Sequence, residues 1–208
     1  MRALTRDIAE LERIARRLRL HIVRMMGVGQ KGHLGGSCSM ADVVAALYFA
    51  KMRHDPEDPR WPDRDRFLLS KGHAALVQYA ALAESGYFPL EALETTKALG
   101  SILQGHPDLK STPGVEANTG SLGQGLSIAC GLAAGLRIDG RPSRVYCVAG
   151  DGEMAEGQIW DAAMAAVEFL KEREQEIEGQ ILLVGAADEE RGSEFGAVFL
   201  LQDPEFRS

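Results

Sequence analysis

The sequence lacks the features that mark membrane, secreted and nucleic-acid-binding proteins. No apolar run among its 208 residues approaches the ~18 residues that a membrane helix needs. Residues 1–17, MRALTRDIAELERIARR, are charged throughout and contain no apolar core of a secretory signal. No basic patch with interleaved aromatic residues occurs, which argues against nucleic-acid binding. We therefore expect neither a membrane nor a nucleic acid among its partners.

Cysteine is also scarce. The three cysteines, Cys38, Cys130 and Cys147, are an odd number and do not have the spacing of a metal site. Free thiols in a reducing compartment are the simplest interpretation, so we expect a cytoplasmic protein.

The composition is that of a globular chain, with 45% hydrophobic and 25% charged residues and a mean hydropathy of -0.13. The net charge of -7 is unevenly placed, because residues 167–208 hold 11 acidic and 4 basic side chains while residues 1–166 are balanced. We predict a domain over residues 1–166 and an acidic tail of doubtful origin over residues 167–208. The break fits either a fused segment or a solvated acidic helix.

Helical and strand patterns alternate along the first 166 residues. A stripe of Leu4, Ile8, Leu11, Ala15, Leu18 and Ile22 predicts an amphipathic helix over 4–26. After a glycine-rich loop, QKGHLGGSCS, Ser39 and Asp42 resemble a capping box that opens the next helix. The further elements expected are a strand at 67–70 that leads through KGHAA into a helix, a long irregular stretch beyond Gly86, a helix at 127–136, a strand at 143–150 and a helix from about Ala155. This order predicts an α/β fold, a parallel sheet with helices on both faces.

One carboxylate is predicted at the edge of this sheet. In VAGDGEMAEG, Asp151 follows a buried strand and lies between two glycines. The carboxyl ends of parallel strands are where α/β proteins bind ligands, and the flanking glycines let a bulky anion approach the backbone. A lone Asp there suits Mg²⁺, which uses one or two carboxylates together with ligand phosphates. An ordinary Asp-Gly turn after a strand is the alternative.

Three histidines share one local setting, since His33, His73 and His106 each follow a glycine in a predicted loop. A histidine so placed can bind phosphate oxygens, donate to a substrate hydroxyl or move a proton near neutral pH. His21 and His54 lie in other settings and are interpreted as structural. The segment TGSLGQG at 119–125 is a further place for close backbone approach, with neither a Walker A nor a dinucleotide-binding pattern.

Five blocks together resemble the diphosphate-binding half of transketolase, a thiamine diphosphate enzyme, in the family's order. They are GHLGGSCSMADV, DRDRFLLSKGHAALVQYA, GHPD, TPGVEANTGSLGQGLS and VAGDGEMAEGQIWDA. The resemblance extends from about residue 10 to residue 166. It implies an incomplete thiamine-diphosphate-binding fold and the transfer of a two-carbon ketol unit between sugar phosphates, with the cofactor holding the carbon fragment.

The resemblance also implies roles for individual residues. Asp151 is similar to the first Mg²⁺ ligand and Gly152 to the glycine that meets the diphosphate. His73 resembles the histidine at the cofactor, and His33 and His106 resemble those that face the sugar. The segment that lines the aminopyrimidine corresponds to Gly120, Ser121 and Leu122, although many transketolases have proline in place of Ser121. Glu156 matches an interface glutamate.

The chain departs from the family in two respects. Family members carry an Asn that is a second Mg²⁺ ligand some thirty residues after the Asp, whereas this chain has no Asn after Asn118. The glutamate that activates the cofactor lies in a domain not present here. The resemblance is therefore to the N-terminal subunit of a split transketolase, which implies a partner subunit with the pyrimidine and C-terminal domains in a homo- or hetero-oligomer.

The tail has a faint resemblance of its own, to M20-type zinc metallopeptidases, in which Glu189 and Glu190 would be the general base and a zinc ligand. A solvated acidic turn is the alternative. We expect a helix to about Glu178, a strand near 181–186 and poor contacts beyond.

Two further functions stay open. One is a related thiamine diphosphate enzyme, of the deoxyxylulose-phosphate or dihydroxyacetone synthase type. The other is a catalytically dead binding or scaffold module, which the missing Asn favours.

Overall fold

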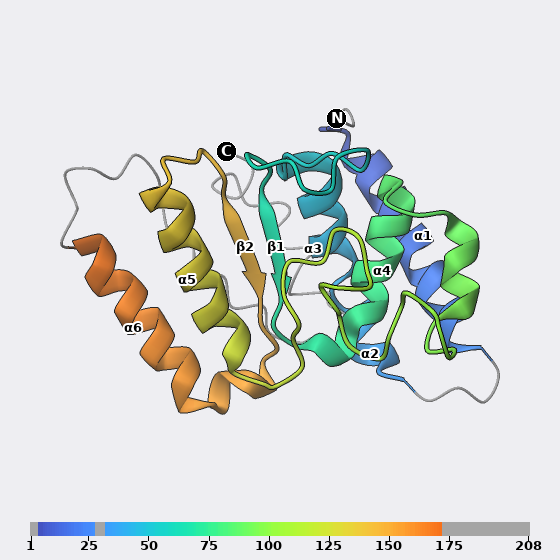
Figure 1. Cartoon of the computed structure of the whole chain (residues 1–208). Helices are drawn as coiled ribbons and strands as arrows, with labels where there is room; N and C mark the ends of the chain where they lie inside the picture. Colours follow the sequence, from blue (N-terminus) through green and yellow to red (C-terminus); the bar gives the residue numbers. More distant parts are fainter. Residues whose placement is uncertain (1–3, 28–31, 172–208) are drawn as a thin grey trace.

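Two parallel strands form the centre of the molecule. Figure 1 shows the computed structural model, which describes residues 4–27 and 32–171. Strand β1 (Arg66–Leu69) pairs with β2 (Val145–Val148), with Arg66 opposite Val145 and Leu69 opposite Val148. Both strands lie close to the ranges predicted from their apolar runs, and their parallel pairing is confirmed.

Helices lie on both faces of this sheet, as predicted for an α/β fold. In Figure 1, α1, α3 and α4 lie on one side of the strands and α5 and α6 on the other. The helices and helical turns are α1 (Ile8–Met26), α2 (Leu34–Cys38), α3 (Ala41–Ala46), η1 (Leu47–Lys51), η2 (Gly72–Ala74), α4 (Ala75–Ser85), η3 (Leu90–Thr95), α5 (Gln124–Ile138), η4 (Gly152–Ala155) and α6 (Gly157–Lys171). No helix of the described residues is long and apolar enough to span a membrane.

The main core lies between β1 and the helices α1, α3 and α4. Phe67 and Leu69 belong to it, and the ring of Phe67 meets the ring of Tyr48 edge to face at 5.3 Å. Helix α4 is apolar on nearly all sides, and each of its residues from Ala75 to Ala83 is buried. A helix that is apolar on nearly all sides is stable only where other elements cover it. Helix α4 therefore lies in the middle of the layer formed by α1, α3 and α4.

Helix α1 is amphipathic, as predicted, but begins at Ile8 rather than at Leu4. The Asp7 carboxylate caps it by accepting a hydrogen bond from the backbone N–H of Ala9 at 2.9 Å. Leu4 and Ile8 are each 44% exposed, so the inward stripe starts later than expected. The buried stripe consists of Leu11, Ile14, Ala15, Leu18, Ile22 and Met25.

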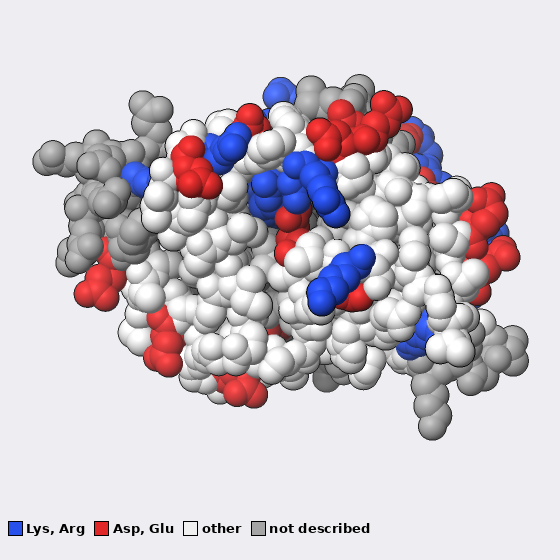
Figure 2. Space-filling view, viewed as in Figure 1, with Lys and Arg blue, Asp and Glu red and all other residues white. Residues whose placement is uncertain are grey.

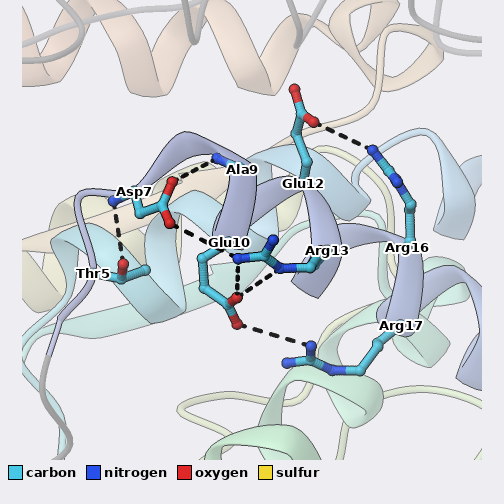
Figure 3. A network of polar contacts seen from close by, with 8 residues as sticks. All are labelled: Thr5, Asp7, Ala9, Glu10, Glu12, Arg13, Arg16 and Arg17. Atoms are coloured by element: carbon cyan, nitrogen blue, oxygen red, sulfur yellow. Dashed lines mark hydrogen bonds and ion pairs between the residues drawn. The ribbon is translucent and has the colours of Figure 1, made fainter.

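The outer face of α1 carries a ladder of ion pairs (Figure 3). Glu10 meets Arg13 at 2.8 Å and Arg17 at 3.9 Å, and Glu12 meets Arg16 at 3.2 Å. Exposed pairs three or four residues apart, such as Glu10–Arg13 and Glu12–Arg16, contribute only about 0.3–0.5 kcal/mol each. The buried stripe therefore holds the helix in place, and the ion pairs keep its outer face soluble.

The glycine-rich segment after α1 differs from the prediction. Residues 34–38 form the short helix α2 rather than a loop. The capping box at Ser39 and Asp42 is wrong, because the Ser39 hydroxyl donates to the carbonyl of Gly36 and the Asp42 carboxylate pairs with Arg19 of α1. Helix α3 starts at Ala41 without a side-chain cap and continues into the π-helical turn η1.

Smaller differences concern the later helices. Helix α5 begins at Gln124, three residues before the predicted start. Helix α6 begins at Gly157, because the 3₁₀ turn η4 comes between it and β2. The irregular stretch predicted beyond Gly86 contains the 3₁₀ turn η3, and only residues 96–123 after it have neither helix nor strand. The predicted helix end at Glu178 and strand at 181–186 lie outside the described residues. The three cysteines are free thiols, as expected.

Candidate functional site

The carboxyl ends of the two strands open into one cleft. In Figure 1 both arrowheads point to the lower edge of the molecule, where α2 and the first turns of α5 and α6 also lie. The cleft has a volume of about 500 Å³. Its lining comes from four segments: Gly32, His33, Leu34, Gly35 and Gly36; Lys71 and His73; Leu122; and Gly150, Asp151, Gly152 and Glu153. Four of the five blocks found in the sequence therefore meet at this edge of the sheet.

His33 and His73 are neighbours in this cleft. Their ring centroids are 4.7 Å apart. Burial lowers the pKa of His73 below its ordinary value, and electrostatic repulsion by the neighbouring His33 and Lys71 lowers it further, against the opposing charge of Glu153. At neutral pH the ring of His73 is therefore uncharged, with one nitrogen that donates and one that accepts a hydrogen bond.

His106 lies beside the cleft rather than among the residues that line it. Its ring packs on Gly120 so closely that a Cβ at that glycine would lie 2.5 Å from Cδ2 of the ring. The buried phenol of Tyr79 donates to the backbone carbonyl of His106 at 2.9 Å. The charge of His106 also lowers the pKa of His73, so the third histidine belongs to the same electrostatic neighbourhood.

The segment 119–125 supplies one apolar side chain to the cleft. Leu122 lines the cleft and is 42% exposed. Gly123 has a φ of +84°, a backbone conformation that side-chain-bearing residues rarely adopt, and it turns the chain into α5. Gly120 and Ser121 come just before Leu122 but are not among the lining residues, and the carbonyl of Ser121 accepts from the N–H of Gln124 at 3.3 Å.

Asp151 and Gly152 follow β2 closely, at the start of η4. Both are exposed on the cleft side, and a Cβ at Gly152 or at Gly35 would meet no atom within 4 Å. The glycine-lined rim thus leaves room for a bulky anionic group beside the backbone, with a carboxylate next to it.

This donor set fits Mg²⁺ only in company with a ligand. Among the described residues, no cluster of three or more His, Cys, Asp or Glu side chains could hold a metal ion. Mg²⁺ usually keeps one or two carboxylates and takes its other oxygens from phosphates and water. One carboxylate, Asp151, beside a space for a diphosphate meets that requirement.

Two charged residues of the cleft were not singled out from the sequence. Lys71 is 3% exposed and Glu153 is 2% exposed, although both lie in blocks that the sequence pointed to. The Glu153 carboxylate accepts hydrogen bonds from the Ser70 hydroxyl at 2.5 Å, from the Gly123 N–H at 2.9 Å and from the Gly150 N–H at 2.8 Å. The only sequence signal for either residue was its position next to a glycine, Gly72 for Lys71 and Gly152 for Glu153.

The remaining candidates lie away from the cleft. Glu156 is exposed, and its Cβ lies 3.1 Å from the position that a Cβ on Gly123 would take. His21 meets Glu84 at 2.9 Å, and the buried ring of His54 meets the carbonyl of Tyr48 at 2.8 Å. Both histidines thus have structural partners. The tail residues Glu189 and Glu190 lie outside the described part of the chain.

Comparison with known proteins points to one family. A family model described as transketolase, thiamine diphosphate binding domain, matches residues 11–172. A 6-deoxy-6-sulfo-D-fructose transketolase subunit of Clostridium sp. (strain MSTE9) is 48% identical over 160 residues, which are 77% of this chain and 57% of that protein. An apulose-4-phosphate transketolase subunit of Actinobacillus succinogenes is 42% identical over 161 residues, 77% of this chain and 58% of that protein.

A solved structure gives the same result. The transketolase of Campylobacter jejuni is similar with a TM-score of 0.71 at 33% identity, over 76% of this chain and 26% of that chain. The chain thus spans more than half the length of the two relatives and about a quarter of the Campylobacter enzyme. By its sequence over residues 11–172 and by its fold, the chain belongs to the transketolase family, in which it represents the thiamine diphosphate binding domain.

Proposed function

We propose that the chain binds thiamine diphosphate and Mg²⁺ as the N-terminal part of a transketolase that moves a two-carbon ketol unit between sugar phosphates. The observation that carries this proposal is the meeting of His33, His73, Leu122 and Asp151, from four distant segments, in one glycine-lined cleft. The two relatives are named for sugars that carry a phosphate or a sulfo group. We therefore propose anionic sugars as the substrate class, within cytoplasmic carbohydrate metabolism.

Asp151, Gly152 and Leu122 each have a distinct task in this proposal. Asp151 supplies one oxygen ligand to Mg²⁺, and the backbone at Gly152 lies against the diphosphate. Leu122 offers an apolar surface to the aminopyrimidine ring, next to Gly120 and Ser121. Bound thiamine diphosphate supplies the carbanion chemistry that ordinary side chains lack.

The histidines handle hydrogen bonds and protons. His73, uncharged at neutral pH, donates or accepts at the cofactor without adding a positive charge. His33, 4.7 Å away between ring centroids, faces the space where a sugar would lie, and we assign His106 to the same side. Hydroxyl groups of a sugar are weak acids, so a neighbouring imidazole speeds their proton transfers.

A matching partner would complete the enzyme. We propose that it carries the pyrimidine and C-terminal domains and joins this chain in a homo- or hetero-oligomer, since the two relatives are themselves only parts of an enzyme by name. Glu156, exposed beside the start of α6, is our candidate for a contact with another chain.

The test of cofactor binding is calorimetry on the full chain with thiamine diphosphate, with and without Mg²⁺. We expect Mg²⁺-dependent binding in the wild type and its loss in Asp151→Ala, because Glu153, the other carboxylate of the described cleft lining, is buried and engaged by three donors. Asp161→Asn, which removes one exposed negative charge from α6, is the matched control and should bind as the wild type does. Undiminished Mg²⁺-dependent binding by Asp151→Ala would refute the metal assignment.

One observation favours a second function, a binding module without catalysis. No Asn follows Asn118, so the second Mg²⁺ ligand expected from the family resemblance has no counterpart in this sequence. The same calorimetry separates the two functions, since a dead module would show no Mg²⁺-dependent binding of the cofactor. A related thiamine diphosphate enzyme would also bind the cofactor but act on other substrates.

A further inference from the structure

Glu153 is a buried carboxylate whose partners all belong to the edge of the cleft. Its side chain is 2% exposed. One carboxylate oxygen, Oε1, accepts from the Ser70 hydroxyl and the Gly123 N–H, and the other, Oε2, accepts from the Gly150 N–H. A buried carboxylate is costly unless it is well hydrogen-bonded, and three donors satisfy this one.

The three donors come from three different elements. In the sequence, Ser70 directly follows β1, Gly150 lies shortly after the end of β2, and Gly123 directly precedes α5. Helix α5 also packs against Ser70, since a Cβ at Gly125 would lie 2.4 Å from Oγ of Ser70. Glu153 therefore joins both strand ends to the first turn of a helix that is more than fifty residues from β1 in sequence.

A second buried carboxylate lies at the opposite end of the same strands. Asp65 is 2% exposed and precedes β1. It accepts from the backbone N–H of Arg53 at 2.9 Å and of Arg144 at 2.8 Å. Both carboxylates thus brace the strand pair, but only Glu153 is also part of the cleft. Asp65 is accordingly the natural control for a purely structural effect.

We propose that Glu153 is a positioning residue, which fixes Asp151 through the N–H of Gly150 and Leu122 through the N–H of Gly123. Each bond is to the residue next to the one positioned, so its loss lets that neighbour turn. The Asp151 carboxylate would then be held toward the cation and the Leu122 side chain toward the pyrimidine. The relation to cation and cofactor rests on the proposed function, whereas the two hydrogen bonds do not.

Glu153→Gln is the informative substitution. Both carboxylate oxygens act only as acceptors, so an amide must point its NH₂ group at a donor in either orientation. Glutamine keeps the size of the glutamate side chain and loses only one acceptor atom and the negative charge. A hydrogen bond to a charged acceptor is worth enough that its loss should speed exchange of the donor amide by about tenfold or more.

The first measurement is amide hydrogen exchange by NMR on the full chain without ligand. The rates of Gly123 and Gly150 are taken relative to that of Ala81 in the buried helix α4. We expect the ratio of the amide that faces the new NH₂ group, Gly123 or Gly150, to rise about tenfold in Glu153→Gln, and both ratios to stay unchanged in Asp65→Asn, which loosens the far end of the strands. Unchanged ratios in Glu153→Gln would overturn the proposal.

The second measurement is the Mg²⁺ dissociation constant by calorimetry at saturating thiamine diphosphate. We expect it to rise about tenfold in Glu153→Gln and much less in Asp65→Asn. Equal Mg²⁺ affinity in Glu153→Gln and in the wild type would show that Glu153 only stabilises the fold, and it would overturn the positioning role. If the wild type binds no cofactor, the proposed function fails, and the exchange ratios still decide the role of Glu153.

If Glu153→Gln does not fold, Ser70→Ala can be measured in its place. Ser70→Ala removes one donor and leaves the carboxylate with two N–H partners. The Ser70 hydroxyl then no longer fixes the position of Oε1, so we expect a rise of a few-fold in the Gly123 ratio. No change in that ratio would count against the proposal as strongly as no change in Glu153→Gln.

Discussion

His73 is the residue whose charge state the cleft controls most clearly. Burial is the first cause that lowers its pKa, and electrostatic repulsion by His33, Lys71 and His106 lowers it further, while Glu153 acts in the opposite direction. We predict that an NMR titration of the His73 ring gives a midpoint below the ordinary value of about 6.5. In Lys71→Met the midpoint should rise but remain below that value, because the burial persists. A midpoint at or above the ordinary value in the wild type would contradict the geometry.

The same shift has a consequence for stability. A histidine with a lower pKa in the folded state binds its proton more readily in the unfolded chain. The contribution of His73 is therefore complete above about pH 6.5 and is lost as the pH falls through the lowered, folded-state pKa. The free energy of unfolding, measured with urea at pH 7.5 and pH 5, should fall less in His73→Gln than in the wild type.

Single residues show where sequence reasoning reached the site and where it stopped. His33, His73, Leu122 and Asp151 are predictable from motifs, and the structure brings all four to one cleft. Their chemical roles stay predictions. Lys71 and Glu153 are not predictable in this way because charged residues are usually exposed, and only the fold shows that these two are buried.

At the scale of elements, apolar patterns identified the strands and long helices, while local rules failed at the short ones. Helix α2 contains Gly35 and Gly36, each of which costs about 1 kcal/mol relative to alanine in a helix. Contacts with α1 and α4 compensate that cost, and no local pattern records them. The capping box failed for the same reason, since the partner of Asp42 is Arg19 on another helix.

The contact between η2 and the irregular segment before α5 permits a sharp test. A Cβ at Gly72 would lie 2.6 Å from the backbone carbon and oxygen of Thr119 and 2.7 Å from the nitrogen of Gly120. These atoms belong to backbone and have little freedom to move away. We predict that Gly72→Ala lowers the free energy of unfolding by about 1–3 kcal/mol in urea titrations.

Gly131 provides the matched control. It lies inside α5, where an added Cβ would meet no atom within 4 Å. Gly131→Ala should therefore raise the free energy of unfolding by up to about 1 kcal/mol, because alanine is the better helix former. A stability loss of similar size in both variants would show that the close contact at Gly72 is not its cause.

For the whole molecule, several apolar side chains of α5 and α6 are exposed. Ile128 of α5 is 39% exposed, and Trp160 and Met164 of α6 are 50% and 62% exposed. The face shown in Figure 2 is largely uncharged over α5. Leu122, just before α5, is 42% exposed and lines the cleft. Exposed apolar side chains that gather in one patch usually mark sites of association, and we predict that another chain covers those of α5 and α6.

The last prediction joins this surface to the activity. We expect residues 1–208 by themselves to show no ketol transfer, because the cleft of the isolated chain is open to water. Positioning of reactants and exclusion of water together supply several kcal/mol of a typical catalysed barrier. Ketol transfer, followed as aldose and ketose phosphates are interconverted, should appear only when a matching C-terminal subunit is added.

Light scattering should show the two chains as one complex, and Trp160→Glu should weaken that complex while thiamine diphosphate binding by the isolated chain is kept. Turnover by the isolated chain would mean that the cleft is already complete, and the exposed surface on α5 and α6 would then need a different explanation.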